Sequence, residues 1–248
     1  MGSLLRYSFW LLVGLVGLPR FAAAQALDPA FHIPEIYRPA LVNDAAQQPD
    51  GQYVVAGAFT RANGLSSNTL TRLDAAGAVD QTFRQNLSSA TVQAQKVYPM
   101  ANGQLLVIGS YQAGAVQRRY LFRLNADGTL DPTLTLTFPG PYPYPSATQV
   151  LVQPDGRMLL LGYFTGSNTE IYRLLPDGTR DPSFNVTLLV GSQDTKMLLQ
   201  PDGKLILGGD FTWVNGERGF FIARLNPDGS TDASYHSAAY TNARLYIN

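Results

Sequence analysis

The chain has 248 residues, of which 45% are hydrophobic and only 15% charged, and its 18 basic side chains balance its 18 acidic ones. The absence of cysteine excludes disulfide frameworks, zinc–cysteine sites, thiol nucleophiles and lipid anchoring through an N-terminal cysteine. With no net basic charge, a nucleic-acid-binding surface is not expected. The acids are fifteen Asp and three Glu. This bias favours turns over helices, because Asp bonds to nearby backbone whereas Glu fills helix faces.

Residues 1–24 have the three parts of a secretory signal peptide. Arg6 precedes an apolar run over residues 9–18, and Ala22-Ala23-Ala24 precedes Gln25. The run is shorter than the ~20 residues of a comfortable membrane span, and no later stretch reaches that length; a buried N-terminal helix is the alternative. We expect cleavage after Ala24 and a secreted or cell-surface protein with no membrane span. The mature domain, residues 25–248, then carries 16 basic and 18 acidic groups.

The main feature of the chain is a pattern that occurs four times at a period near 51 residues. Each copy begins with a tight turn that ends in glycine, followed by a second glycine six residues later and by an aromatic residue two positions after that. An Arg-Leu pair, a second turn glycine, and an Asp with a large apolar side chain three residues later complete the copy. In chain order the first-turn glycines are Gly51, Gly103, Gly156 and Gly203, the arginines Arg72, Arg123, Arg173 and Arg224, and the final Asp residues Asp80, Asp131, Asp181 and Asp232. These landmarks place the repeats at about 42–83, 92–134, 147–184 and 193–235.

Each copy predicts four short strands. They are the segment before the first turn (such as 149–152), the apolar run after it (204–207), the strand with the Arg-Leu pair (220–225) and the Asp-x-x-Phe piece. The apolar run suits a strand covered on both faces, and no segment has a sustained helical period with caps. We expect the glycine after the second strand to lie where neighbouring blades approach closely.

Four short strands in about fifty residues, repeated, are typical of a propeller blade, which must stack on its neighbours to bury both faces. The sequence therefore predicts an all-β, β-propeller-like stack of four-stranded blades. A β-solenoid, whose repeats are usually much shorter, and a string of independent small sheets are the alternatives.

The fourth copy carries a family resemblance. Its strings Gln-Pro-Asp-Gly-Lys-Leu-Ile-Leu-Gly-Gly-Asp-Phe-Thr and Ile-Ala-Arg-Leu-Asn-Pro-Asp-Gly-Ser, followed by Asp-x-Ser-Tyr, closely resemble the delta-60 repeat of bacterial β-propeller proteins. The resemblance covers about residues 26–248; copy two departs most, with Ala101-Asn102 in place of Pro-Asp and Leu134 in place of the aromatic. It implies an exported, often surface-associated bacterial repeat protein, and it implies no catalytic residues.

Partial repeats flank the four complete ones. Residues 28–31 match the last piece of a repeat, and residues 243–247 match a first strand. Together they cannot complete a fifth blade, so the expected ring is open or truncated. Exposed sheet edges invite a partner, and pairing through the incomplete terminal blade is one such interaction.

The repeated acids and arginines have structural and functional interpretations. Eleven of the fifteen Asp fall on repeat landmarks, where one carboxylate per turn is unlike the clustered acids of a calcium loop. We therefore predict no metal site and no cofactor. The repeated arginines could line a channel and bind anions, but we expect them to pair with the Asp residues of their own or the adjacent blade.

The function predicted from the residues is binding rather than catalysis. Neither a serine-hydrolase elbow nor a zinc-protease or phosphate-binding motif is present. An exported hydrolase or lyase built on non-repeat acids is the alternative; its candidate residues are Asp44, Asp194, Asp210 and Glu217. Departures from the repeat are where a binding site is most readily added. Tyr142 and Tyr144, in a Pro-rich insert, and Trp213, in the loop after the second strand of copy four, are the candidate contacts for an extracellular protein or carbohydrate.

Overall fold

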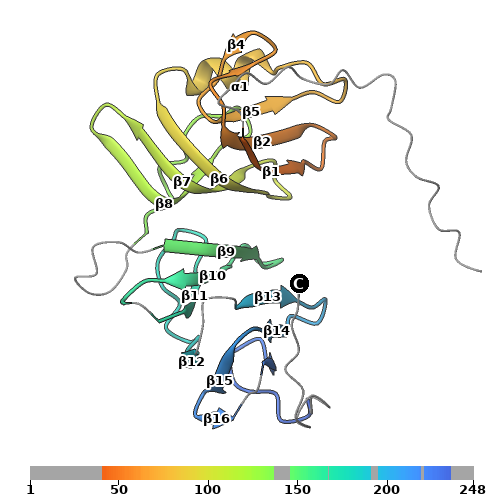
Figure 1. The fold of residues 1–248 in the computed structure, drawn as a ribbon, viewed down its shortest axis with the longest axis vertical. Coiled ribbons are helices and arrows are strands. Elements are labelled where there is room, and N and C mark those ends of the chain that lie inside the picture. Colours follow the sequence, from red (N-terminus) through yellow and green to blue (C-terminus); the bar gives the residue numbers. More distant parts are fainter. Residues whose placement is uncertain (1–40, 137–145, 167, 191–194, 219–220, 236–248) are drawn as a thin grey trace, which may run out of the picture.

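Four three-stranded antiparallel sheets follow one another along the chain, one for each repeat (Figure 1). The computed structural model describes residues 41–136, 146–166, 168–190, 195–218 and 221–235. The predicted signal peptide, the two partial repeats, and Tyr142 and Tyr144 lie outside these ranges. Within them, strands and tight turns dominate, and the all-β, open propeller-like stack predicted from the repeats is confirmed.

In every sheet the second strand of the repeat is central, flanked by the first and third. The sheets comprise β1 (Leu41–Gln47), β2 (Tyr53–Ala58) and β5 (Leu70–Leu73); β6 (Thr91–Pro99), β7 (Leu105–Ala113) and β8 (Val116–Leu124); β9 (Ser146–Val152), β10 (Met158–Tyr163) and β11 (Glu170–Leu174); and β13 (Lys196–Leu199), β14 (Leu205–Gly208) and β17 (Ile222–Leu225). Two small sheets accompany them. One is the hairpin of β3 (Arg61–Ala62) and β4 (Leu65–Ser66), and the other is formed by β12 (Leu188–Val190), β15 (Phe211–Val214) and β16 (Glu217–Arg218).

The fourth strand of each predicted blade is reduced to a single bridge. Val79, Leu130, Arg180 and Thr231 each pair with the last residue of the third strand, and the Asp that follows donates its backbone N–H to the carbonyl of the repeated Arg. The Asp side chain then accepts from backbone two or three residues ahead, which turns the chain out of the sheet. Each blade therefore has three strands, and an isolated β-bridge stands in place of the predicted fourth strand.

The first repeat adds one helix where none was expected. Asp80 caps α1 (Gln81–Leu87) by accepting from the backbone N–H of Phe83. The residues after Phe83 are Arg, Gln, Asn and Leu, most of which favour a helix, whereas the third repeat continues with β-branched Val186 and Thr187. This difference in propensity explains why the helix forms in only one of the described repeats.

Alternate residues of each central strand point to opposite neighbouring blades. In β7, Leu105 and Val107 join the cluster shared with the first sheet, whereas Leu106 and Ile108 join the cluster shared with the third. The same alternation in β10 assigns Leu160 to the second sheet's cluster and Leu159 and Leu161 to the fourth's. The near-continuous apolar runs therefore cover both faces of the central strands. No core cluster of the described residues joins the first sheet to the fourth, so these sheets make an open series.

The sequence suggested that the glycine near the end of the second strand lies where two blades approach each other. In the first three repeats it instead lies against a strand of its own sheet. A Cβ on Gly57, Gly109 or Gly162 would stand 1.9–2.0 Å from a carbonyl oxygen of the first strand of the same sheet. In each sheet the register shifts there, which marks a β-bulge. The missing side chain of the glycine thus allows the backbones of the first and second strands of one blade to approach closely. Among the described residues, no helix is long and apolar enough to cross a membrane.

Candidate functional site

The four repeated arginines form ion pairs with the Asp eight residues later. Arg72–Asp80, Arg123–Asp131, Arg173–Asp181 and Arg224–Asp232 have N–O distances of 2.7–2.8 Å. The first three arginine side chains are only 5–9% exposed, so these are buried, charge-assisted hydrogen bonds. The predicted Arg–Asp pairing is confirmed, and of the two blades left open by the sequence it is the arginine's own blade that supplies the Asp. The arginines thus hold structural ion pairs.

The same arginines also join one repeat to the next. Nη1 of Arg72, Arg123 and Arg173 donates to the carbonyl of Ala126, Pro176 and Pro227 respectively, each in the second turn of the following repeat. The guanidinium groups of Arg72 and Arg173 also stack over Phe83 and Phe184 at 4.6–4.7 Å from the ring centroids. Each of these three arginines therefore bonds to the corner of its own blade and to the turn of the next blade.

The Asp131 carboxylate predicts acid sensitivity. Burial raises its pKa, but bonds from the Thr133 hydroxyl and N–H and from Arg123 outweigh burial and bring the pKa to about 2. Because the folded pKa lies below the unfolded value of ~3.9, the group stabilises the fold fully above that value and loses its contribution as pH falls through about 2. Between about pH 4 and 2, we expect Asp131→Asn to lose about 2 kcal/mol less unfolding free energy, measured by urea unfolding, than the unsubstituted chain. An identical pH profile for the two proteins would contradict this.

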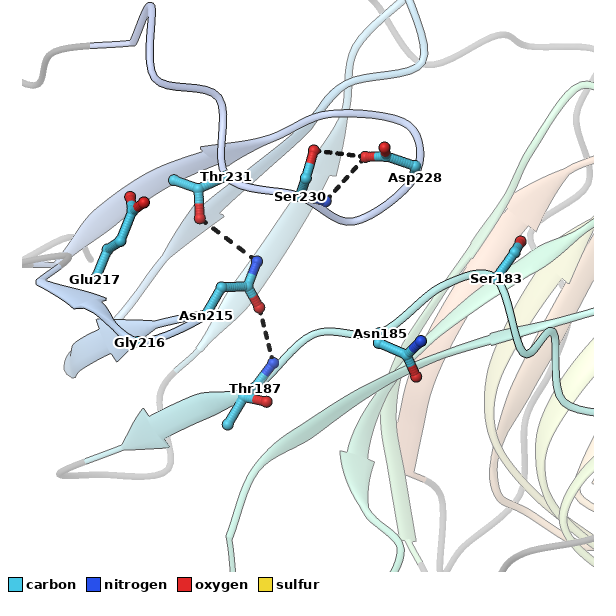
Figure 2. A pocket seen from close by; sticks show the side chains of 9 residues that line it. All are labelled: Ser183, Asn185, Thr187, Asn215, Gly216, Glu217, Asp228, Ser230 and Thr231. Atoms are coloured by element: carbon cyan, nitrogen blue, oxygen red, sulfur yellow. Dashed lines mark hydrogen bonds between the residues drawn. The ribbon is translucent and has the colours of Figure 1, made fainter.

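A polar groove of about 680 Å³ lies beside the β15–β16 hairpin of the fourth repeat (Figure 2). One side is the segment that leads from the third repeat into β12, and the other side is the hairpin with the second turn of the fourth repeat. Hydroxyl, amide and carboxylate side chains line it; the residues are Ser183, Asn185, Thr187, Asn215, Gly216, Glu217, Asp228, Ser230 and Thr231. This composition suits a polar ligand that both donates and accepts hydrogen bonds.

Asn215 fixes the shape of the groove. It has a φ of 52° and precedes Gly216 at 81°, the pair of left-handed residues that a tight hairpin turn requires. Its Oδ1 accepts from the N–H of Thr187 at 3.0 Å, and its Nδ2 donates to the Gly229 carbonyl at 2.8 Å and toward the Thr231 hydroxyl at 3.4 Å. In Figure 2 the Asn215 side chain accordingly lies between Thr187 and Thr231. The groove walls are therefore held together before any ligand binds.

The two carboxylates of the groove differ in their surroundings. The Ser230 hydroxyl and N–H both donate to one oxygen of Asp228 at 2.7 and 2.9 Å, and these bonds lower the Asp228 pKa. Glu217 is exposed in β16, and none of the hydrogen bonds between described residues uses its side chain. Glu217 thus has both oxygens available to a ligand's hydroxyl or N–H groups.

Trp213 lies in a strand, β15, and not in a loop as the sequence suggested. It pairs with Leu189 of β12 on one side and with Arg218 of β16 on the other, and the Arg218 guanidinium stands 5.4 Å from its ring centroid. The ring is half-buried and belongs to the hairpin that forms the groove, although it is not among the lining residues. Trp213 therefore offers an aromatic surface next to the groove.

The other candidate residues do not gather into one site. Asp44 accepts from the Val97 N–H at 2.9 Å, Asp210 is exposed after β14, and Asp194 lies outside the described ranges together with Tyr142 and Tyr144. Within the described part of the chain, no group of three His, Asp or Glu side chains is placed to hold a metal ion.

Sequence reasoning found Trp213 and Glu217 but missed the hydroxyl and amide residues around them. A signal was present: Phe-Thr-x-x-Asn-Gly occurs at 59–64 and again at 211–216. In the first repeat Asn63 also has a positive φ, and its Nδ2 donates to the Gly77 carbonyl at 3.3 Å. The shared hairpin could therefore be predicted, whereas the groove depends on how the linker between repeats passes it.

Comparison with known families accounts for all four repeats. Residues 48–83, 101–134, 153–184 and 200–235 match the family described as "Domain of unknown function (DUF5122) beta-propeller". The matched segments run in each case from the first turn to the residue that packs after the repeated Asp. No curated protein matches the chain.

Proposed function

Because the chain belongs to the DUF5122 beta-propeller family, we propose that it is a secreted, non-enzymatic repeat scaffold of the delta-60 type that binds a glycan or protein at the cell surface. The observation that carries the proposal is the groove beside Asn215, where hydroxyl, amide and carboxylate groups stand next to a half-buried tryptophan. Hydrogen-bonding side chains beside an aromatic face are the chemistry that recognises sugars and polar peptide segments. The signal-peptide pattern of residues 1–24 supports export.

Two features of the site favour binding. Asn215 fixes the walls through bonds to Thr187 and Gly229, so little ordering is required when a ligand enters. Glu217, on the same hairpin, is open to solvent. A rigid polar groove with one uncommitted carboxylate fits a ligand rich in hydroxyl groups.

The test compares ligand capture by the exported chain with ligand capture by three variants. Mass spectrometry of the exported chain identifies its N-terminus and so tests the predicted cleavage after Ala24. We expect a glycan array or titration calorimetry to find a ligand whose affinity falls at least tenfold in Trp213→Ala and in Glu217→Gln. Arg61→Ala is the matched control, because Arg61 takes the place of Trp213 in the first repeat's hairpin. Equal affinity in all variants would remove the groove from the proposal, and a Tyr142→Ala/Tyr144→Ala variant tests the Pro-rich insert in the same way.

An exported hydrolase or lyase is the second candidate, and the observation that favours it is the presence of two carboxylates, Glu217 and Asp228, on one groove. Catalysis by such a pair requires one group to act as an acid or base while the other remains charged. Turnover of the captured glycan that is lost in Glu217→Gln would favour this alternative. Capture without turnover would favour the binding scaffold.

A further inference from the structure

The same kind of hydrogen bond occurs at all three interfaces between successive repeats. In each, the side chain seven residues before the first-turn glycine of one repeat bonds to the backbone of the next repeat. Asp44 accepts from the Val97 N–H at 2.9 Å, and Lys96 donates to the Thr148 carbonyl at 2.7 Å. The Gln149 side chain accepts from the Met197 N–H through Oε1 and donates to the Met197 carbonyl through Nε2, both at 2.8 Å. Each first strand is thus fastened to the first strand of the next repeat, although the side chains differ.

Apolar packing repeats at the same interfaces. The third residue after each first-turn glycine faces the following blade, and it is 0–1% exposed at Val54, Leu106 and Leu159. The residue five before that glycine packs into the same clusters at Ala46, Tyr98 and Leu151. Together with the Arg bond to the next turn, three kinds of contact define one face of a repeat.

Among the described residues, few cover this face of the fourth repeat. Leu198, which takes the place of Leu151, is 63% exposed; Ile206 is half-buried and Lys196 is exposed. The Arg224 side chain is 22% exposed, and its Nη1 makes no hydrogen bond to any described residue, unlike its three counterparts. We call this surface of Lys196, Leu198, Ile206 and Arg224 the donor face.

The first strand of the first repeat presents the complementary surface. Ala45 is exposed, whereas its counterparts Val97, Val150 and Met197 are 0–4% exposed beneath the preceding repeat. Val42 is 48% exposed, and Ala94, which also pairs with the bulge glycine of its sheet, is 4% exposed. We call the surface of Leu41, Val42 and Ala45 the acceptor strand.

The distribution of exposed apolar side chains supports a relation between the two surfaces. Among the described residues only four large hydrophobic side chains are strongly exposed. Leu41 and Val42 lie on the acceptor strand and Leu198 on the donor face, whereas Val116 lies at the start of β8. Val42 and Leu198 therefore lie at positions that other repeats bury, wholly or in part, against a neighbouring repeat. The counterparts of Leu41, which are Gln93 and Ser146, are exposed.

We propose that the donor face binds the acceptor strand of a second copy of this chain, so that the molecules associate head to tail. The interface continues the one already used three times within the chain. Lys196 would reach the backbone of Asn43, as Lys96 reaches Thr148, and Arg224 would reach the exposed Ala75, which takes the turn position of Ala126. Such an interface is heterologous, so repeated association gives closed rings or filaments.

The first experiment measures the oligomeric state of the exported full chain by sedimentation velocity over a range of concentrations. We expect association that depends on concentration and that weakens at least tenfold in Leu198→Lys and in Val42→Lys. Val116→Lys is the matched control and should associate normally. A mixture of Leu198→Lys and Val42→Lys should form one-to-one dimers and nothing larger, because only one intact pair of surfaces remains. A monomeric unsubstituted chain, or a mixture that stays monomeric while Val116→Lys associates, would overturn the proposal.

The second experiment uses the absence of native cysteine. Ala45→Cys and Leu198→Cys chains, mixed and oxidised, should give a disulfide-linked dimer of one copy of each. Equal yields of dimer from Leu198→Cys alone would indicate pairing of two donor faces. An intramolecular disulfide in the double variant would indicate that the chain closes on itself. Either result contradicts head-to-tail association.

Discussion

Gly109→Ala is expected to lower the free energy of unfolding by about 3 kcal/mol or more. The new methyl group would stand 1.9 Å from the Gln93 carbonyl oxygen and 3.1 Å from the Ala94 Cα. These are backbone atoms of β6, so the overlap cannot be relieved by a side-chain rotation. Gly109 also has a φ of 154°, a conformation that an alanine adopts only under strain. Urea unfolding followed by circular dichroism measures the loss.

Two further glycine substitutions separate the causes. Gly162 has no left-handed φ, but its Cβ would meet the Ser146 carbonyl oxygen at 2.0 Å, so Gly162→Ala tests the overlap alone. Gly166→Ala meets no atom within 4 Å and has no left-handed φ, so it should leave the unfolding midpoint nearly unchanged. If all three alanine variants unfolded at the same urea concentration, the bulge would not require glycine.

Arg123→Met is expected to lower the free energy of unfolding by about 3 kcal/mol. The substitution keeps an unbranched apolar stem but removes the guanidinium and its bonds to Asp131 at 2.7 Å, Thr133 at 3.0 Å and the Pro176 carbonyl at 2.8 Å. The 7%-exposed Asp131 side chain loses its opposite charge, and a buried carboxylate without its cation is costly. Thermal and urea unfolding measure the effect.

Two controls show whether the position of the arginine matters. Arg119→Met, on an exposed residue of the same strand, should change the stability by less than about 0.5 kcal/mol. Arg224→Met should cost less than Arg123→Met, because Arg224 is more exposed and makes no bond to a following repeat in the described part of the chain. Equal losses in all three variants would contradict a role in joining repeats.

The pairing of Arg with Asp could be predicted because both recur in register in every copy. A recurring charge on a buried strand must find a recurring partner, and the repeated Asp residues of the same or the adjacent blade were the available ones. The structure selects the Asp eight residues later. The second bond of each Arg could not be predicted. It depends on which backbone carbonyl the next blade presents, and a carbonyl has no signature in the sequence.

The binding groove was predictable only in part. Trp213 and Glu217 stood out as departures from the repeat, and Asn215-Gly216 marked a tight hairpin. Ser183, Asn185 and Thr187 carry no such signal, because Ser, Thr and Asn are common in any connection between strands. They become part of the groove only because the segment leading into β12 is fastened to Asn215.

By itself, the sequence determined the four repeats, their three principal strands, the turns and the Arg–Asp pairs, because each of these depends on residues at constant spacing within one copy. Only the tertiary structure decided that the fourth strand is a single bridge, that Gly57, Gly109 and Gly162 meet their own sheet and that three of the arginines bond to the turn of the next repeat. These features depend on distances between backbones and on packing between copies. The repeated residues are the same in every copy, so they do not reveal either quantity. The same packing leaves Leu198 and Val42 exposed, and it is this exposure that points to a second copy.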